Sequence, residues 1–327
     1  MSTKLRLSLA CGDYEITRPL KDGRVQPDGI ELTVLSPESL ERHWRVARGQ
    51  EYDICEFNAP AYFMGRYRGL PYTALPVYLH RRFRHGFIFV NSKKGIAQPK
   101  DLIGRRIGGT NYQPAACIWM RGVLEEFYHV PHRSIAWMTE RDEDIPFDCP
   151  QGLKIEKVAA GKTVDEMAAA GEIDGLLTPS FPRPFLAGNP NLVRLFPNYR
   201  EVEIEYWRRT GIFPIMHVTI IRADILKRDP WVAASLARAF DRAKALAYAR
   251  VRNPRVVPLA WFSTFWEEQQ AVLGPDPWAY GLGPANRKNL ETAIRYTYQQ
   301  GLIGRQMTIE ELFVDTDEDA YHGPGGD

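Results

Sequence analysis

Apolar residues recur at two different spacings along the first 90 residues of the chain. Alternation of apolar and polar positions is typical of a strand, and a spacing of three to four residues is typical of an amphipathic helix. These spacings predict strands at 5–10, 29–35 and 53–57, and helices at 37–49 (with Ser36 as the N-cap) and 59–69. Strands that alternate with helices indicate a parallel sheet.

A second unit of the same kind occupies the middle of the chain. A strand at 83–91 leads out of the first unit, and a strand at 213–221 leads back toward it. Between them the spacings predict strands at 106–109, 155–158, 173–177 and 192–196, and helices at 113–128 and 163–170. The last third is mostly helical, and the acidic, Gly- and Pro-rich tail after Asp315 is expected to fray.

This order predicts an α/β protein with two lobes. Residues 1–88 and 220–327 form lobe one, residues 89–219 form lobe two, and the C-terminal helices pack on lobe one. Two crossover strands join the two mixed or parallel sheets, with a hinge near 85–91 and 212–221. This organisation resembles that of type II periplasmic-binding proteins, and we expect the lobes to close around a ligand at the carboxyl ends of the strands.

Composition narrows the class of partner. The 327 residues suit about two domains, and the balance of 42 basic against 40 acidic residues argues against nucleic acid. The chain has no run of 18 apolar residues that would span a membrane, and its first residues alternate rather than form a secretory leader. We therefore expect a cytoplasmic protein with no membrane partner; the helix-rich last third allows a homo-oligomer.

The four cysteines are far apart in the sequence. Cys11, Cys55, Cys117 and Cys149 show no CxxC spacing, so we expect free thiols rather than a zinc site.

The two crossovers carry the titratable residues of greatest interest. Arg84 and His85 are adjacent on the first crossover and His217 lies on the second, so one of the first two can face the cleft beside His217. An arginine fork matches a carboxylate, and a histidine exchanges protons near neutral pH. Arg82 belongs to the same basic cluster. The alternative for Arg84 and His85 is a solvated basic surface. The alternative for His217 is a buried histidine that is hydrogen-bonded to a backbone carbonyl.

Polar residues also follow two strands of lobe one. Asp13 and Tyr14 follow the first strand, and Glu56 and Asn58 end the third. Glu56 beside a histidine would act as a base or orient the imidazole. Asn58 precedes Ala59-Pro60 and is equally suited to be a helix N-cap.

Lobe two offers a second set of candidates. Asn111 and Gln113 precede a helix whose N-terminus can bind an anion. Thr178 and Arg183 follow a strand in the same lobe. Ordinary turn chemistry is the alternative for each of these four residues.

Four segments together carry a family resemblance, namely RFRHGFIFVN (82–91), DLIGRRIGG…WMRGVL (101–124), GIFPIMH (211–217) and DPWAYGLGPANR (276–287). As a set, over residues 5–313, the chain resembles the 4,5-dihydroxyphthalate decarboxylase family. The resemblance implies a binding-protein-like fold and a cytoplasmic enzyme that converts a small aromatic carboxylate, 4,5-dihydroxyphthalate, to protocatechuate. It implies no organic cofactor.

Decarboxylation of such a ring needs three groups. A base draws on the phenol proton, an acid protonates the ring carbon, and a cation holds the other carboxylate. His85, His217 and Glu56 are the expected catalytic residues, and Arg84 is the expected cation. The same two histidines and glutamate also match a two-His, one-carboxylate metal set, which spacing neither supports nor excludes. Two other hypotheses remain: a non-catalytic binder of a small acid, and an enzyme for another aromatic acid.

Overall fold

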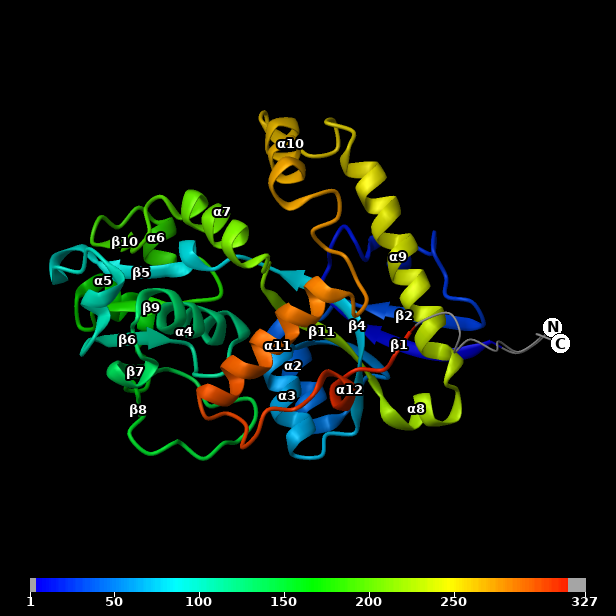
Figure 1. Ribbon diagram of the computed structural model, residues 1–327, viewed down its shortest axis with the longest axis horizontal. Helices are drawn as coiled ribbons and strands as arrows, with labels where there is room; N and C mark the ends of the chain where they lie inside the picture. The colour runs from blue at the N-terminus through cyan, green and yellow to red at the C-terminus, as the bar shows by residue number, and fades with distance from the viewer. Residues whose placement is uncertain (1–3, 317–327) are drawn as a thin grey trace.

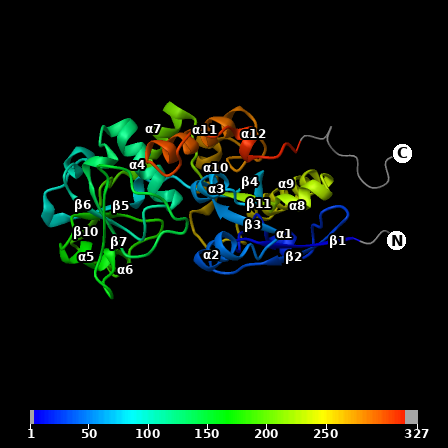
Figure 2. The same cartoon turned by 90° about the horizontal axis from the view of Figure 1, so that it is seen from below.

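Two α/β lobes lie side by side in the computed structural model, which describes residues 4–316 (Figure 1). The N-terminal segment and the C-terminal third build lobe one, and the middle of the chain builds lobe two; the view from below shows the same division (Figure 2). The predicted two-lobed architecture with two mixed sheets is confirmed. None of the helices among residues 4–316 is both long and apolar enough to cross a membrane.

The sheet of lobe one has five strands in the order β2-β1-β3-β11-β4. β1 pairs in parallel with β2 and β3, whereas β11 runs antiparallel to both β3 and β4. Its strands are β1 (Leu5–Ala10), β2 (Ile30–Leu35), β3 (Ile54–Asn58), β4 (Tyr72–Arg81) and β11 (Ile215–Arg222). The helices of this lobe are α1 (Arg18–Lys21), α2 (Ser39–Gly49), α3 (Ala59–Tyr67), α8 (Ala223–Arg228), α9 (Trp231–Val251) and α12 (Ile309–Leu312).

The sheet of lobe two has six strands in the order β10-β5-β9-β6-β7-β8. β9, β6, β7 and β8 are parallel, and β5 is antiparallel to β9 and β10. The strands are β5 (Ile88–Asn91), β6 (Arg106–Gly109), β7 (Ala136–Thr139), β8 (Lys154–Lys157), β9 (Gly175–Leu177) and β10 (Leu192–Arg194). The helices are α4 (Ala115–Tyr128), α5 (Val164–Ala170), α6 (Arg183–Leu186) and α7 (Tyr199–Thr210).

The first crossover differs from its prediction. The expected continuous strand at 83–91 is wrong: β4 ends at Arg81, a 3₁₀ turn covers His85–Phe87, and β5 begins only at Ile88. The returning strand β11 pairs with lobe-one strands along its length, so the predicted boundary at residue 219 moves to before Ile215. Ser36 is not the N-cap of α2, because that helix begins after Glu38. Asn58 does cap α3, through Oδ1 and the N–H of Ala61 at 3.1 Å.

A continuous apolar core joins the two lobes. It includes Phe57 and Tyr62 of lobe one together with Ile107 and Trp137 of lobe two. The C-terminal helices were predicted to pack on lobe one. Helix α11 (Pro284–Gln299) instead contacts both α3 of lobe one and α4 of lobe two. Helix α10 (Phe262–Leu273) also reaches lobe two, where Nε1 of Trp207 donates to its Val272 carbonyl. The lobes are thus joined by a shared core and by α11 as well as by the two crossovers.

Candidate active site

Residues of both lobes line a cavity of about 530 Å³. This volume is within the usual range of small-molecule sites. Lobe one contributes the C-terminal ends of β1, β3 and β4 and the starts of β11 and α2, and lobe two contributes the loops that follow β6, β7 and β9. Its polar lining includes Tyr14, Glu38, His43, Asn58, His80, Arg84, Asn111, Glu140, Arg141, Asp144, Thr178, Ser180 and His217.

Glu56 lies directly behind the lobe-one wall and is fully buried on β3. Its Oε1 accepts from the Tyr14 hydroxyl at 2.8 Å and from Nδ1 of His217 at 2.6 Å. Its Oε2 accepts from the Gly12 N–H at 2.8 Å and lies 3.0 Å from Nη2 of Arg42. Burial acts to raise the pKa of Glu56, but His217 and then Arg42 outweigh it, and the pKa lies well below its ordinary value.

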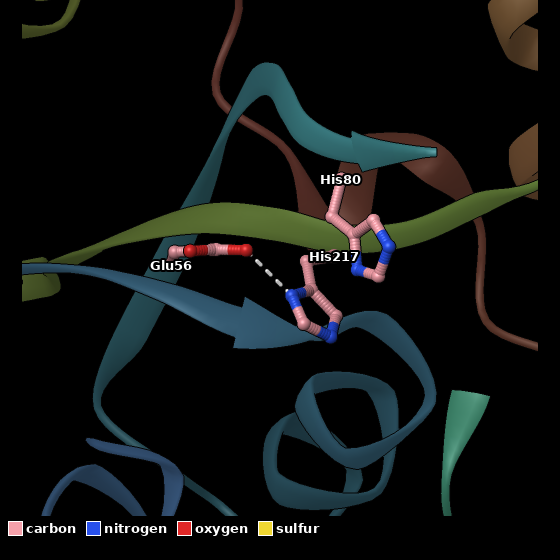
Figure 3. A group of neighbouring side chains, drawn as sticks. All are labelled: Glu56, His80 and His217. Carbon is pink, nitrogen blue, oxygen red and sulfur yellow. Dashed lines mark hydrogen bonds and ion pairs between the residues drawn. The ribbon is translucent and has the colours of Figure 1, made fainter. Parts of the chain in front are cut away.

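His217 is held by this carboxylate at the wall of the cavity (Figure 3). Its strand β11 runs between β3 and β4, which places the residue beside Asn58 on one side and His80 on the other. Because Nδ1 is bonded to Glu56, Nε2 is the ring nitrogen that remains for a ligand. A histidine oriented in this way by a carboxylate is the arrangement of a general acid–base group.

Two further histidines flank His217. The rings of His80 and His217 are 4.8 Å apart between centroids, and those of His43 and His217 are 5.0 Å apart. Burial, and then the charge of His217, lower the pKa of His80 to about 2, so its imidazole is neutral at physiological pH. Burial likewise lowers the pKa of His43 far below its ordinary value. Nδ1 of His80 has no hydrogen-bond partner among residues 4–316.

Arg84 supplies a buried positive charge at the same cavity. Its Nη1 donates to the Pro179 carbonyl at 2.9 Å, and its Nε lies 3.2 Å from Sδ of Met216. Within the described chain no carboxylate lies within 4.0 Å of the guanidinium. Burial lowers the pKa of Arg84 to about 9, which still leaves it charged at neutral pH. The guanidinium is thus available to a bound anion.

His85 points elsewhere, and its predicted pairing with His217 is wrong. It lies in the 3₁₀ turn and lines a separate apolar hollow with Phe83 and Tyr206. Its Nδ1 is 3.9 Å from Oε1 of Glu203, and burial lowers the pKa of His85 to about 4. The alternation argument failed because the segment is not a strand.

Four other predicted binding residues do not line the cavity. Asp13 is exposed and pairs with Lys21 at 3.2 Å, and Arg82 is exposed above the Phe87 ring. Arg183 is exposed and lies 3.7 Å from Asp165. The buried Gln113 holds the backbone of Ile145 on both sides, so its role is to fix the adjacent loop.

Four further residues that were predicted to bind the substrate do line the cavity, namely Tyr14, Asn58, Asn111 and Thr178. His80 and His43 also line the cavity, although neither was among the predicted site residues. The available signal for His80 was the apolar run of β4 that ends just before it at Leu79; Pro76 inside the run obscured the strand.

Three residues of metal-ligating type meet at the lobe-one wall of the cavity. His85 does not join the predicted set; Glu56, His80 and His217 instead offer ligand-type atoms within 4.8 Å of one another. However, both oxygens of Glu56 are already engaged, by three hydrogen bonds and the ion pair with Arg42, and the 2.6 Å contact with His217 is one of those hydrogen bonds. Two ligands at 2.0–2.1 Å from one tetrahedral zinc ion stand about 3.3 Å apart. The arrangement fits a hydrogen-bonded dyad better than an ion site.

The comparisons with known proteins agree with this description. Residues 26–132 match the family model "NMT1/THI5 like". The chain is 34% identical over 320 residues to a 4,5-dihydroxyphthalate decarboxylase of Comamonas testosteroni, covering 95% of this chain and 97% of the relative. It is also 34% identical over 212 residues to one of Pseudomonas putida, covering 63% and 82% respectively.

Solved structures are similar in fold. The aliphatic sulphonate binding protein SsuA of Escherichia coli superposes with a TM-score of 0.57 at 9% identity, covering 96% of this chain and 98% of that one. SsuA of Xanthomonas axonopodis pv. citri, bound to MOPS, gives 0.55 at 12% identity, with coverage of 96% and 98%.

The fold and the site together define a two-lobed binding-protein scaffold with a carboxylate–histidine dyad and a buried arginine at its cleft. Within that class, the chain belongs to the 4,5-dihydroxyphthalate decarboxylase family, a family of carboxy-lyases.

Proposed function

We propose that this protein decarboxylates a dihydroxylated aromatic dicarboxylate in the interlobe cavity, with 4,5-dihydroxyphthalate as substrate and protocatechuate and CO2 as products. The observation that carries the proposal is the Glu56–His217 dyad facing a cavity that also contains the unpaired cation Arg84. The family relationship supports the substrate. A cytoplasmic location and a homo-oligomeric state stay predictions from the sequence.

The reaction replaces a carboxylate with a proton at one ring carbon. The hydroxyl para to the departing carboxylate feeds electron density to that carbon, which accepts a proton from Nε2 of His217. The carbon–carbon bond then breaks, CO2 leaves, and the bonding electrons restore the aromatic ring. The anionic Glu56 stabilises the imidazolium from which the proton comes.

His80 and Arg84 complete the site. His80 is neutral at physiological pH and therefore acts as a hydrogen-bond acceptor toward a substrate hydroxyl or a water at the cavity wall. Arg84 holds the carboxylate that stays on the ring, because its fork fits two carboxylate oxygens. Fixing the ring in this way supplies a large part of the barrier reduction, up to about 7–11 kcal/mol in favourable cases. We propose that neither a metal ion nor an organic cofactor takes part.

The test is turnover by the purified protein. Protocatechuate formation is followed with 4,5-dihydroxyphthalate for the wild type, His217→Ala and the control His129→Ala, an exposed histidine at the end of α4. We expect turnover in the wild type and the control, and a loss of about 10²–10⁴-fold in His217→Ala. A wild type without turnover on this substrate would reject the assignment.

A second candidate is non-catalytic binding of an aromatic carboxylate, favoured by the likeness in fold to sulphonate-binding proteins. A binder gains little from a histidine oriented by a buried carboxylate, which is why we prefer the enzyme. Saturable binding of 4,5-dihydroxyphthalate by calorimetry, with no CO2 released over hours, would support the binder instead.

A further inference from the structure

Arg42 is a buried cation that lies outside the cavity. It is 1% exposed on α2, and its Nε donates to the Glu56 carbonyl at 3.1 Å. Its Nη1 donates to the Pro37 carbonyl at 3.2 Å, and its Nη2 lies 3.0 Å from Oε2 of Glu56. All three nitrogens therefore face β3 or the turn before α2, and none is among the cavity-lining groups.

The position of the Glu56 carboxylate depends on this cation. Oε2 lies between Arg42 and the Gly12 N–H, so Oε1 must face Tyr14 and His217. A rotation of the carboxylate away from His217 would separate Oε2 from the buried guanidinium. A buried guanidinium without its partner is costly, so the carboxylate stays in the orientation that His217 needs.

We propose that Arg42 is a positioning residue for the reaction: it holds Glu56 ionised and turned toward Nδ1 of His217, which leaves Nε2 of His217 directed at the substrate. Arg42 itself touches no reacting atom and acts through Glu56. The inference rests on the proposed function for its kinetic consequence, whereas the geometry of the Arg42–Glu56–His217 series is independent of which aromatic acid is bound.

The charged and titratable groups that surround Glu56 and His217 come from several elements. They are Cys11 and Tyr14 beyond β1, Arg42 and His43 on α2, Cys55 on β3, His80 on β4, and Arg84 beyond β4. Arg42 is the only one of these that reaches Oε2 with a positive charge. Loss of Arg42 therefore leaves Oε2 with the Gly12 N–H alone, and it also removes the effect of Arg42 on the pKa of His43.

The experiment compares Arg42→Met, Arg42→Lys and the control Arg45→Met. Arg45 lies three residues further along α2, where its 40% exposed side chain pairs with Glu41. We expect Arg42→Met to lower kcat about 10- to 100-fold, part of the ~10²–10⁴ that acid–base catalysis contributes, with KM within about twofold. Its kcat–pH profile should shift, whereas Arg42→Lys should recover kcat to within about fivefold and Arg45→Met should match the wild type.

A spectroscopic readout keeps the test independent of turnover. An Nδ1–H bonded to a carboxylate at short range gives a proton resonance far downfield, so wild type and Arg42→Lys should show it and Arg42→Met should not. If Arg42→Met does not fold, Arg42→Gln keeps a polar side chain without the charge, leaves Glu56 in place and should also lack the resonance. Retention of the resonance and of kcat without Arg42, or an equal loss in Arg45→Met, would overturn the proposal. A wild type that shows the resonance but no turnover rejects only the proposed function.

Discussion

Replacing Glu56 with glutamine changes one atom at the centre of the site and allows a quantitative expectation. In the carboxylate, Oε1 accepts two hydrogen bonds while Oε2 accepts one and pairs with Arg42, whereas an amide has only one oxygen. If that oxygen stays with Arg42 and Gly12, the NH2 group faces Nδ1 of His217. Nδ1 must then accept a hydrogen bond, so the neutral imidazole keeps its proton on Nε2. The imidazolium form of His217 no longer has an anionic partner that stabilises it.

Two effects of different size follow from this change. We expect kcat to fall about 10²–10⁴-fold, because the proton on Nε2 then belongs to a neutral imidazole, which is a much weaker acid than the imidazolium that Glu56 stabilises. The fold should lose about 3–5 kcal/mol, because Arg42 is left buried without a carboxylate. Protocatechuate formation measures the first effect, and chemical denaturation measures the second. A folded Glu56→Gln protein with kcat within threefold of the wild type would refute the reasoning, and His129→Ala serves as the control.

Three further predictions follow from the contacts. Arg84→Met should raise KM at least about 10-fold, since a charge-assisted hydrogen bond contributes about 1.5–3 kcal/mol; an unchanged KM would remove Arg84 from substrate binding. His85→Ala should keep kcat within threefold of the wild type but lower the unfolding temperature, because His85 lines the apolar hollow and not the cavity; a kcat loss above 100-fold would restore it as a catalytic candidate. Stability should fall as the pH drops below about 4.5, because the pKa of Glu56 is lower in the folded than in the unfolded chain, so the unfolded state takes up the proton first. Acid denaturation of Glu56→Gln should show a weaker dependence on pH over that range, and an equally steep curve would contradict the assignment.

The lobe architecture was predictable because strand and helix periodicities are local properties. β1 was placed with its full bounds and β2 to within one residue, since their alternation is undisturbed. β4 was missed because Pro71 and Pro76 break the pattern. The core that joins the lobes through α11 depends on contacts between distant segments, which no local pattern reveals.

The site residues that could be predicted are titratable side chains near the end of a predicted strand. Glu56 and His217 meet because β3 and β11 are neighbours in the sheet. The prediction of His85 depended on a continuous strand that the structure breaks with a 3₁₀ turn, and His80 rather than His85 lines the cavity. Arg42 was not identified because a helix residue that points inward toward a carboxylate has the same sequence appearance as one that points to solvent.

The most direct test of the central claim is decarboxylation in D2O by the wild type and by His217→Ala. The account predicts protocatechuate that carries one deuterium at the vacated ring carbon, formed by the wild type and almost absent in the variant. Equal rates of labelled product from both proteins would show that the proton does not come from His217, and would contradict the account.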